Sequence, residues 1–326
     1  AQVNVAGLVA SSLDMSVEDF MNGSHVFESN GSGGLVLNQG SLEAGSGGFI
    51  ALLGEAVANE GLIVADAGTV AMGSGEKVAL DFDGSGLQLF EVQSEVLDSA
   101  LGAESAVSNS GSLFADGGQV LLTAKAAQDV FTQAINNEGL VQARRIENVG
   151  GVVRLTGSGD VFASGTLDAS GGDAESSGGT VQVLGDRVAL YGNASIDVSG
   201  DAGGGLVQVG GAFQGSDPDV MNASDTFVGA DVHVNADATV EGDGGEVIVW
   251  ADETTNYHGT ISARGAGATG SAGFAEVSGK ESLAYRGSVD LTADNGDRGT
   301  LLLDPATITI EGGAADGAAD GNDTFA

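Results

Sequence analysis

Apolar residues alternate with polar ones in short segments along the chain, and each segment follows a glycine. The second and fourth residues after that glycine are apolar, and the residue between them is mostly polar. A period of two is typical of a strand that buries one face. The aligned glycines are Gly40, Gly61, Gly111, Gly139, Gly165, Gly259 and Gly287.

A second kind of segment opens with paired glycines, again with aliphatic residues two and four positions later. Its aligned glycines are Gly48, Gly118, Gly151, Gly179, Gly205 and Gly245. The two kinds of strand therefore alternate, and a unit of roughly 20–30 residues is too small to bury its own aliphatic face.

Stacking such units in register buries a continuous core, and the connections contain no segment long enough for the helix of a βαβ unit. The pattern predicts an all-β parallel β-helix (a solenoid) with short helical and loop excursions. At roughly 24 residues per coil and ~4.8 Å per rung, the chain would form about 13 coils and a rod near 60 Å long.

The position two residues before the first kind of glycine predicts structural ladders. Stacked amides can hydrogen-bond along the rod axis, and stacked aromatic rings can pack along it. The residues at this position are Asn38, Asn59, Asn109, Asn137, Tyr257 and Tyr285.

Several segments depart from the pattern. Residues 16–22 predict a short helix, because Ser16 and Asp19 have the spacing of a capping box and Gly23 follows as a stop. Two weakly helical excursions are expected at 92–101 and 124–135. The largest departure, 211–235, is expected to be an inserted loop. It is the best candidate for a functional protrusion, and the alternative is that it only caps a side face.

Composition and charge exclude some functions. The chain has 326 residues, with 56 glycines, no cysteine and a net charge of −36. Such a charge repels phosphate backbones, so we expect no nucleic-acid partner. The absence of cysteine excludes disulfides and thiolate chemistry. The longest apolar runs are too short to span a bilayer.

No catalytic residue or cofactor-binding residue is assigned. Only three lysines and seven arginines are present, and none recurs on adjacent coils beside carboxylates, as polysaccharide elimination would require. Carboxylate pairs arise by chance among 46 acidic residues and carry little information. The three histidines have no metal-ligand spacing. We therefore expect a non-enzymatic protein.

Two weaker hypotheses concern ligands. A contact surface able to stack on sugars is conceivable at a coil corner formed by Trp250, Tyr257, His258 and Arg286. Calcium is the one candidate metal, because acidic corners offer carboxylate and carbonyl oxygens. The specific sites would be weak ones at Asp294, Asp297, Asp316 and Asp320, and the default expectation is that calcium acts as a diffuse counterion.

Three strings near the end of the chain resemble filamentous haemagglutinin-type two-partner-secretion exoproteins of Gram-negative bacteria. They are GGEVIVWADETTNYHGTISARG, EVSGKESLAYRGSVDLTADNG and GTLLLDPATITI, and the opening AQVNVAGLVASSLDM resembles the later part of the family's secretion domain. The resemblance implies a right-handed β-helix. The family's NPNG-type motif is absent, which suggests a cleaved or truncated N-terminus.

The resemblance also implies biology. We expect a secreted, cell-surface rod for attachment, biofilm or filament formation, exported through an outer-membrane partner barrel. Expected partners are host or bacterial surface glycans or receptors, with end-to-end self-association. The alternative is a carbohydrate-binding or polysaccharide-degrading β-helix protein. The expected division is the remainder of the secretion domain at 1–90, further coils at 91–310, and a flexible acidic, glycine-rich tail at 311–326.

Overall fold

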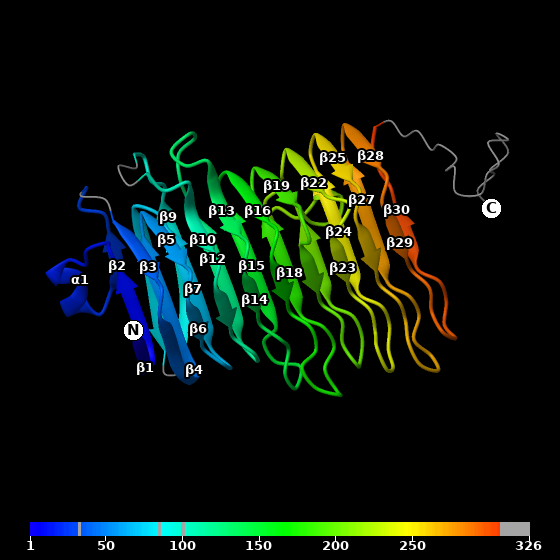
Figure 1. Ribbon diagram of the computed structural model, residues 1–326, viewed down its shortest axis with the longest axis horizontal. Helices are drawn as coiled ribbons and strands as arrows, with labels where there is room; N and C mark the ends of the chain where they lie inside the picture. The colour runs from blue at the N-terminus through cyan, green and yellow to red at the C-terminus, as the bar shows by residue number, and fades with distance from the viewer. Residues whose placement is uncertain (32–33, 84–85, 99–101, 307–326) are drawn as a thin grey trace.

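The computed structural model is a parallel β-helix, and it describes residues 1–31, 34–83, 86–98 and 102–306. Its strands stack along one long axis, as Figure 1 shows from the blue N-terminal end to the orange C-terminal end. In the described part of the chain, no helix is long and apolar enough to cross a bilayer.

Each coil contributes one strand to each of three faces, which we call the first, second and third face in the order the chain follows them. The first and second faces form one sheet of eighteen strands. The first face consists of β6 (Leu62–Val64), β11 (Ser112–Phe114), β14 (Leu140–Gln142), β17 (Thr166–Asp168), β20 (Ser195–Asp197), β23 (His233–Asn235), β26 (Thr260–Ser262) and β29 (Ser288–Asp290). The second face consists of β7 (Thr69–Ser74), β12 (Gln119–Ala124), β15 (Val152–Gly157), β18 (Thr180–Leu184), β21 (Leu206–Val209), β24 (Glu246–Ala251), β27 (Phe274–Gly279) and β30 (Thr300–Leu302).

Two long strands, β1 (Gln2–Ser11) and β4 (Ser41–Gly54), run through both of these faces. The third face is a separate sheet of nine strands. It consists of β3 (Leu35–Asn38), β5 (Ala56–Asn59), β10 (Ser105–Asn109), β13 (Gln133–Asn137), β16 (Asp160–Ala163), β19 (Arg187–Leu190), β22 (Asp225–Val228), β25 (Thr254–Tyr257) and β28 (Ser282–Tyr285).

The register confirms the glycine-based alignment. For example, Leu113 pairs with Ile63 below it and Val141 above it, so equivalent residues of successive coils stack. The glycines mark corners where coils approach closely. A Cβ added at Gly61 would lie 2.2 Å from the carbonyl oxygen of Gly40, and one at Gly118 would lie 2.0 Å from that of Gly68. A side chain at either of these two glycines would collide with the backbone of the previous coil.

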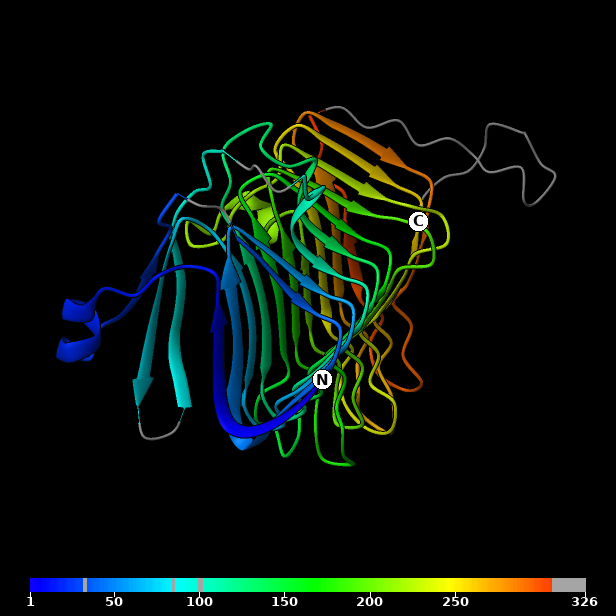
Figure 2. The ribbon, with the colours of Figure 1, turned by 60° about the vertical axis from the view of Figure 1, so that its left-hand side comes forward.

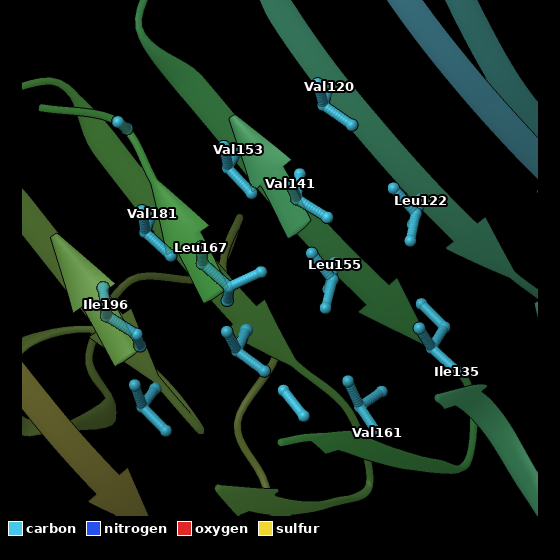
Figure 3. Packing of buried hydrophobic residues seen from close by; sticks show 14 of the residues in the cluster. Val120, Leu122, Ile135, Val141, Val153, Leu155, Val161, Leu167, Val181 and Ile196 are labelled. Atoms are coloured by element: carbon cyan, nitrogen blue, oxygen red, sulfur yellow. The ribbon is translucent and has the colours of Figure 1, made fainter. Parts of the chain in front are cut away.

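The inward residues form one long core of stacked aliphatic rows. Figure 3 shows Val141, Leu167 and Ile196 from the first face beside Val153 and Leu155 from the second. All five are at most 1% exposed. Leu→Ala changes at such sites typically cost about 2–5 kcal/mol, so these rows supply much of the stability.

The number of coils is smaller than expected. The first and second faces each contain eight short strands, and β1 and β4 add one rung each to both faces. The described residues therefore form ten rungs on these faces. Ten rungs span about 45 Å at ~4.8 Å per rung. The estimate of about 13 coils was too high because several segments leave the coil. Separately, the glycine alignment did not include the two strands β20 and β23, because Ala194 and Val232 and not glycines precede them.

Helix α1 (Val17–Asn22) forms as predicted. The hydroxyl of Ser16 accepts from the backbone N–H of Asp19, and Gly23 ends the helix in the left-handed conformation. The helix buries none of its residues and lies beside β2 (His25–Glu28). Figure 2 shows it standing off the N-terminal end of the rod.

The two other helical predictions were wrong. Residues 86–94 form β9, an extended strand, and 125–132 form turns between β12 and β13. Strands β2, β8 (Lys77–Asp83) and β9 make a small antiparallel sheet. This sheet covers the outer face of the first rungs with a second apolar core, which includes Leu53, Val78 and Val92. Val92, which was assigned to the helix expected at 92–101, is buried in that core, and residues 99–101 lie outside the described residues.

The 211–235 segment is only partly a loop. Its second half returns to the coil as β22 and β23, because Thr226, Val228 and Val234 continue the inward rows. The excursion proper occupies residues 211–224 and contains a short 3-10 turn, η1 (Phe213–Gly215). The predicted tail at 311–326 lies outside the described residues.

Candidate interaction surface

The predicted ladders lie in one inward row of the third face. The Nδ2 of Asn38 donates to Oδ1 of Asn59 at 2.8 Å, and the same bond joins Asn59 to Asn109 and Asn109 to Asn137. All four amides are at most 7% exposed. The ladder is therefore part of the interior and is closed to ligands.

Tyr257 and Tyr285 occupy the same row near the C-terminal end. Their rings stack with centroids 5.3 Å apart, and the hydroxyl of Tyr257 donates to the carbonyl oxygen of Ser288. Burial raises the pKa of Tyr257 far above its usual value. Tyr257 is fully buried, so it cannot belong to the contact surface expected from the sequence.

Trp250 is also absent from that surface. It points outward from β24, but residues 211–224 fold over it and leave it 4% exposed. A Cβ at Gly215 would lie 2.5 Å from its Nε1, which shows how closely the excursion packs. The indole N–H donates to Asp252. The excursion therefore covers this part of the second face.

Beside Trp250 the excursion also covers Glu276, which is 0% exposed. One carboxylate oxygen accepts from the backbone N–H of Gln214 at 3.0 Å, whereas the other has no partner. Burial raises the pKa of Glu276, and the nearby charges of Asp304 and Glu246 add to this effect. A buried acid with an unpaired oxygen marks this contact as pH-sensitive.

Two of the four proposed calcium residues lie in the described part of the chain. Asp294 and Asp297 are exposed, and Asp316 and Asp320 lie outside the described residues. Among the residues that the structure describes, no group of three or more His, Cys, Asp or Glu side chains is placed to hold a metal ion.

The remaining two predicted contact residues lie at the outer edge of the third face. Arg286 is exposed, and His258 is half-buried with its ring 6.0 Å from that of Phe227. One coil pair earlier, Phe162 and Tyr191 make the equivalent contact, with centroids 6.2 Å apart. His258 therefore belongs to a set of aromatic residues on the outer surface that the sequence reasoning missed.

The four rings form two pairs, and the second pair lies two rungs after the first. Phe162 and Phe227 lie in one outward row, where Phe162, Ala189, Phe227 and Asn256 follow one another on successive strands. The neighbouring row, one position after each strand, is Ser164, Tyr191, Gly229 and His258, connected by hydrogen bonds to successive coils. Each phenylalanine thus has a Tyr or His ring on the next coil, and Ala189 lies between the two phenylalanines in their row. We call Phe162, Tyr191, Phe227 and His258 the aromatic strip.

A polar border runs along one side of the aromatic strip. Arg187 donates two hydrogen bonds to the carboxylate of Asp160, at 2.8 and 2.6 Å, and Asp225 lies next to it on the following strand. The hydrogen bonds to Asp160 raise the pKa of Arg187, so its charge is retained. Asp160 and Arg187 also line a cavity of about 590 Å³ next to residues 126–132.

Taken together, the fold and surface define a stiff parallel β-helix whose outward residues are free to serve as contacts. The TPS (two-partner secretion) secretion domain model matches residues 1–169. The chain belongs to this family. It is therefore part of a secreted two-partner-secretion exoprotein, with an outer-membrane transporter as its partner.

A solved structure agrees with this assignment. The chain is similar to the crystal structure of the HMW1 secretion domain from Haemophilus influenzae, with a TM-score of 0.72 and 25% sequence identity. The similarity covers 93% of this chain and 76% of that one. No curated protein matches the chain significantly.

Proposed function

We propose that the chain is a non-enzymatic adhesive rod on the exterior of a Gram-negative cell. The observation that carries the proposal is the uninterrupted stack of ten rungs, which holds outward side chains at fixed spacing along about 45 Å. Parallel hydrogen-bond ladders resist deformation along the axis. Contact residues on such a scaffold need no further ordering when they bind.

Attachment is the direct test. Beads coated with the purified chain are incubated with epithelial cells and with bacterial biofilm matrix, and beads coated with an acidic globular protein serve as the control. We expect saturable attachment several-fold above the control. Attachment no greater than the control on every surface would contradict the adhesive role.

Self-association is a separate part of the proposal. The last rung, β28 to β30, has no described strand above it, and unpaired rungs invite pairing with another chain. Electron microscopy at neutral pH, with calcium and with a chelator, distinguishes the outcomes. End-to-end stacking gives filaments with an axial repeat near the rod length, whereas discrete rods in both conditions argue against it.

Calcium is proposed to act as a diffuse counterion for the charge of −36. Side-by-side bundling of rods should then increase with calcium or with salt, as measured by light scattering. Bundling that responds to neither would contradict this electrostatic account. The non-enzymatic assignment is checked by incubating the chain with neutral and uronate polysaccharides, where a rise in reducing ends would overturn it.

A further inference from the structure

The aromatic strip is a feature of the outer surface that the fold itself does not require. Inward rows must be apolar to form the core, but outward positions of the third face can be polar at no cost. Phe227 is nevertheless 41% exposed and Tyr191 36% exposed. The rings pack in pairs across adjacent coils, Phe162 with Tyr191 and Phe227 with His258.

We propose that the aromatic strip binds a linear neutral polysaccharide that lies along the rod axis. The inference rests on the proposed adhesive function and names its ligand class and site. The face of a pyranose ring carries C–H groups that pack on an aromatic ring, while its edge carries hydroxyls that need hydrogen-bond partners. The aromatic strip offers rings for the sugar face, and the polar border beside it offers hydrogen-bond partners for the hydroxyls.

The spacing of the strip favours a polymer over a single sugar. Phe162 and Phe227 are two rungs apart, which is about 9.6 Å at ~4.8 Å per rung and close to the length of two linked pyranose units. The second ring of each pair, Tyr191 or His258, is displaced by one rung in the same direction. Ala189 places only a methyl group between Phe162 and Phe227, so no larger side chain in that row stands between the two phenylalanines.

The polar border supplies hydrogen bonds along one edge of that chain. The carboxylate of Asp160 is held by Arg187 at 2.6 Å, so both groups are already oriented before a ligand arrives. Asp225 continues the border on the next strand. Fixed donors and acceptors lower the ordering cost of binding hydroxyls.

Charge selects a neutral ligand. Asp160, Asp186 and Asp225 surround the single guanidinium of Arg187. A polysaccharide that carries uronate or sulfate groups would meet this acidic border and the overall charge of −36. A protein partner would require a larger apolar patch, and here the four rings are flanked by Asp160, Asn256 and Ser164.

Binding is tested with immobilised linear glucan, mannan, galactan and chitin-type oligosaccharides, and with polygalacturonate as the anionic probe. The wild-type chain should bind at least one neutral probe more tightly than polygalacturonate. The variants Phe162→Ala and Phe227→Ala should each weaken that binding about tenfold, and together more than fiftyfold. Leu37→Ala is the matched control, because Leu37 is an exposed apolar residue on β3 of the same sheet, and it should change binding less than twofold.

The outcomes separate this inference from the proposed function. If wild type binds none of the neutral probes, or if the double variant binds as wild type does, the inference is overturned. The same holds if wild type dimerises through the strip and the double variant does not, as measured by sedimentation. Bead attachment that survives in the double variant overturns the polysaccharide site alone, whereas absent wild-type attachment contradicts the adhesive function itself. Circular dichroism of each variant verifies that the β-helix is intact.

Discussion

One inward row of the third face is filled by amides in the N-terminal half of the rod and by aromatic rings near its C-terminal end. In the first half, each asparagine donates to the next at 2.8 Å. Near the end, two tyrosine rings stack at 5.3 Å. The full row is Asn38, Asn59, Asn109, Asn137, Ala163, Leu190, Val228, Tyr257 and Tyr285.

The comparison shows that the side chain at one position of the row depends mainly on the side chains at the same position of the rungs above and below it. A buried amide is stable only where the next rung accepts its N–H, and a ring only where the next rung leaves room to stack. The change of chemistry occurs at Asn137. The rung above it holds Ala163, so its Nδ2 has no amide to donate to there and keeps the bond to the carbonyl oxygen of Gly139, a bond that Asn38 and Asn59 also make to Gly40 and Gly61.

The largest effect is expected at the aromatic end. Tyr257 is fully buried, so Tyr257→Ala should lower the free energy of unfolding by about 4 kcal/mol, through lost contacts and a cavity. Tyr285→Ala, on the last described rung of this face, should cost about half as much, because Tyr285 is only partly buried. Urea denaturation followed by circular dichroism measures both. An equal loss of unfolding free energy in the two variants would mean that ring stacking, and not burial, determines the contribution of each tyrosine.

The amide end should respond to the loss of a single member. Asn109→Ala leaves the N–H of Asn59 and the carbonyl oxygen of Asn137 unpaired and buried, and we expect a loss of about 3 kcal/mol. The exposed Asn193 gives the control, since Asn193→Ala should change stability by less than about 0.5 kcal/mol. A loss at Asn109 no greater than the control's would show that water replaces the missing amide.

The boundary between the two chemistries can be moved. Ala163→Asn places an amide directly above Asn137, whose N–H can then donate to it. Val228→Asn places the same group between Leu190 and Tyr257, where neither side chain on the adjacent rungs offers an amide partner. We expect the second variant to be less stable than the first by about 2 kcal/mol, from matched urea titrations. The reverse order would show that steric fit at residue 163 outweighs hydrogen bonding.

Much of this architecture could be predicted from the sequence, because its corners leave a local signal. Glycines at close coil contacts and alternating aliphatics gave the strands, their stacking and the asparagine ladder. The rungs of β20 and β23 were missed where Ala194 and Val232 replace the expected glycine. Their inward residues Ile196 and Val234 keep the pattern, so an alignment on the aliphatic rows alone would have found them.

The exposure of outward side chains was harder to predict, because it depends on which loops cover the outside of each strand. Alternation places Trp250 outward, but only the folded excursion reveals that it is covered. The aromatic strip does have a signal in the sequence. The strings DVFAS at 160 and DTFVG at 225 match in their first and third residues. Their two-rung spacing becomes visible only after β19 is placed between them.

The smallest expected effect contrasts two carboxylates, one from each half of the rod. Burial raises the pKa of Asp116, but hydrogen bonds from Arg144 and Gln142 outweigh it, and the net pKa lies below the usual value. Its contribution to stability is therefore present above the unfolded-state pKa and is lost as the pH falls through the folded-state pKa. Burial dominates at Glu276 and raises its pKa. Its contribution is present at low pH and is lost as the pH rises through the folded-state pKa.

Hydrogen exchange of the 211–222 backbone amides between pH 5 and pH 8, corrected for intrinsic rates, measures the second contribution locally. In the wild type, opening of this segment over Glu276 should become more frequent as the pH rises, because the buried carboxylate ionises more readily once it is solvated. Glu276→Gln removes the charge and keeps an acceptor for the N–H of Gln214, so protection should gain about 1 kcal/mol at pH 8 and lose its pH dependence. Asp116→Asn, made in the other half, should leave the exchange of 211–222 unchanged. The same pH dependence in wild type and Glu276→Gln would show that another group controls the segment, and the two halves would then differ only in their ladders.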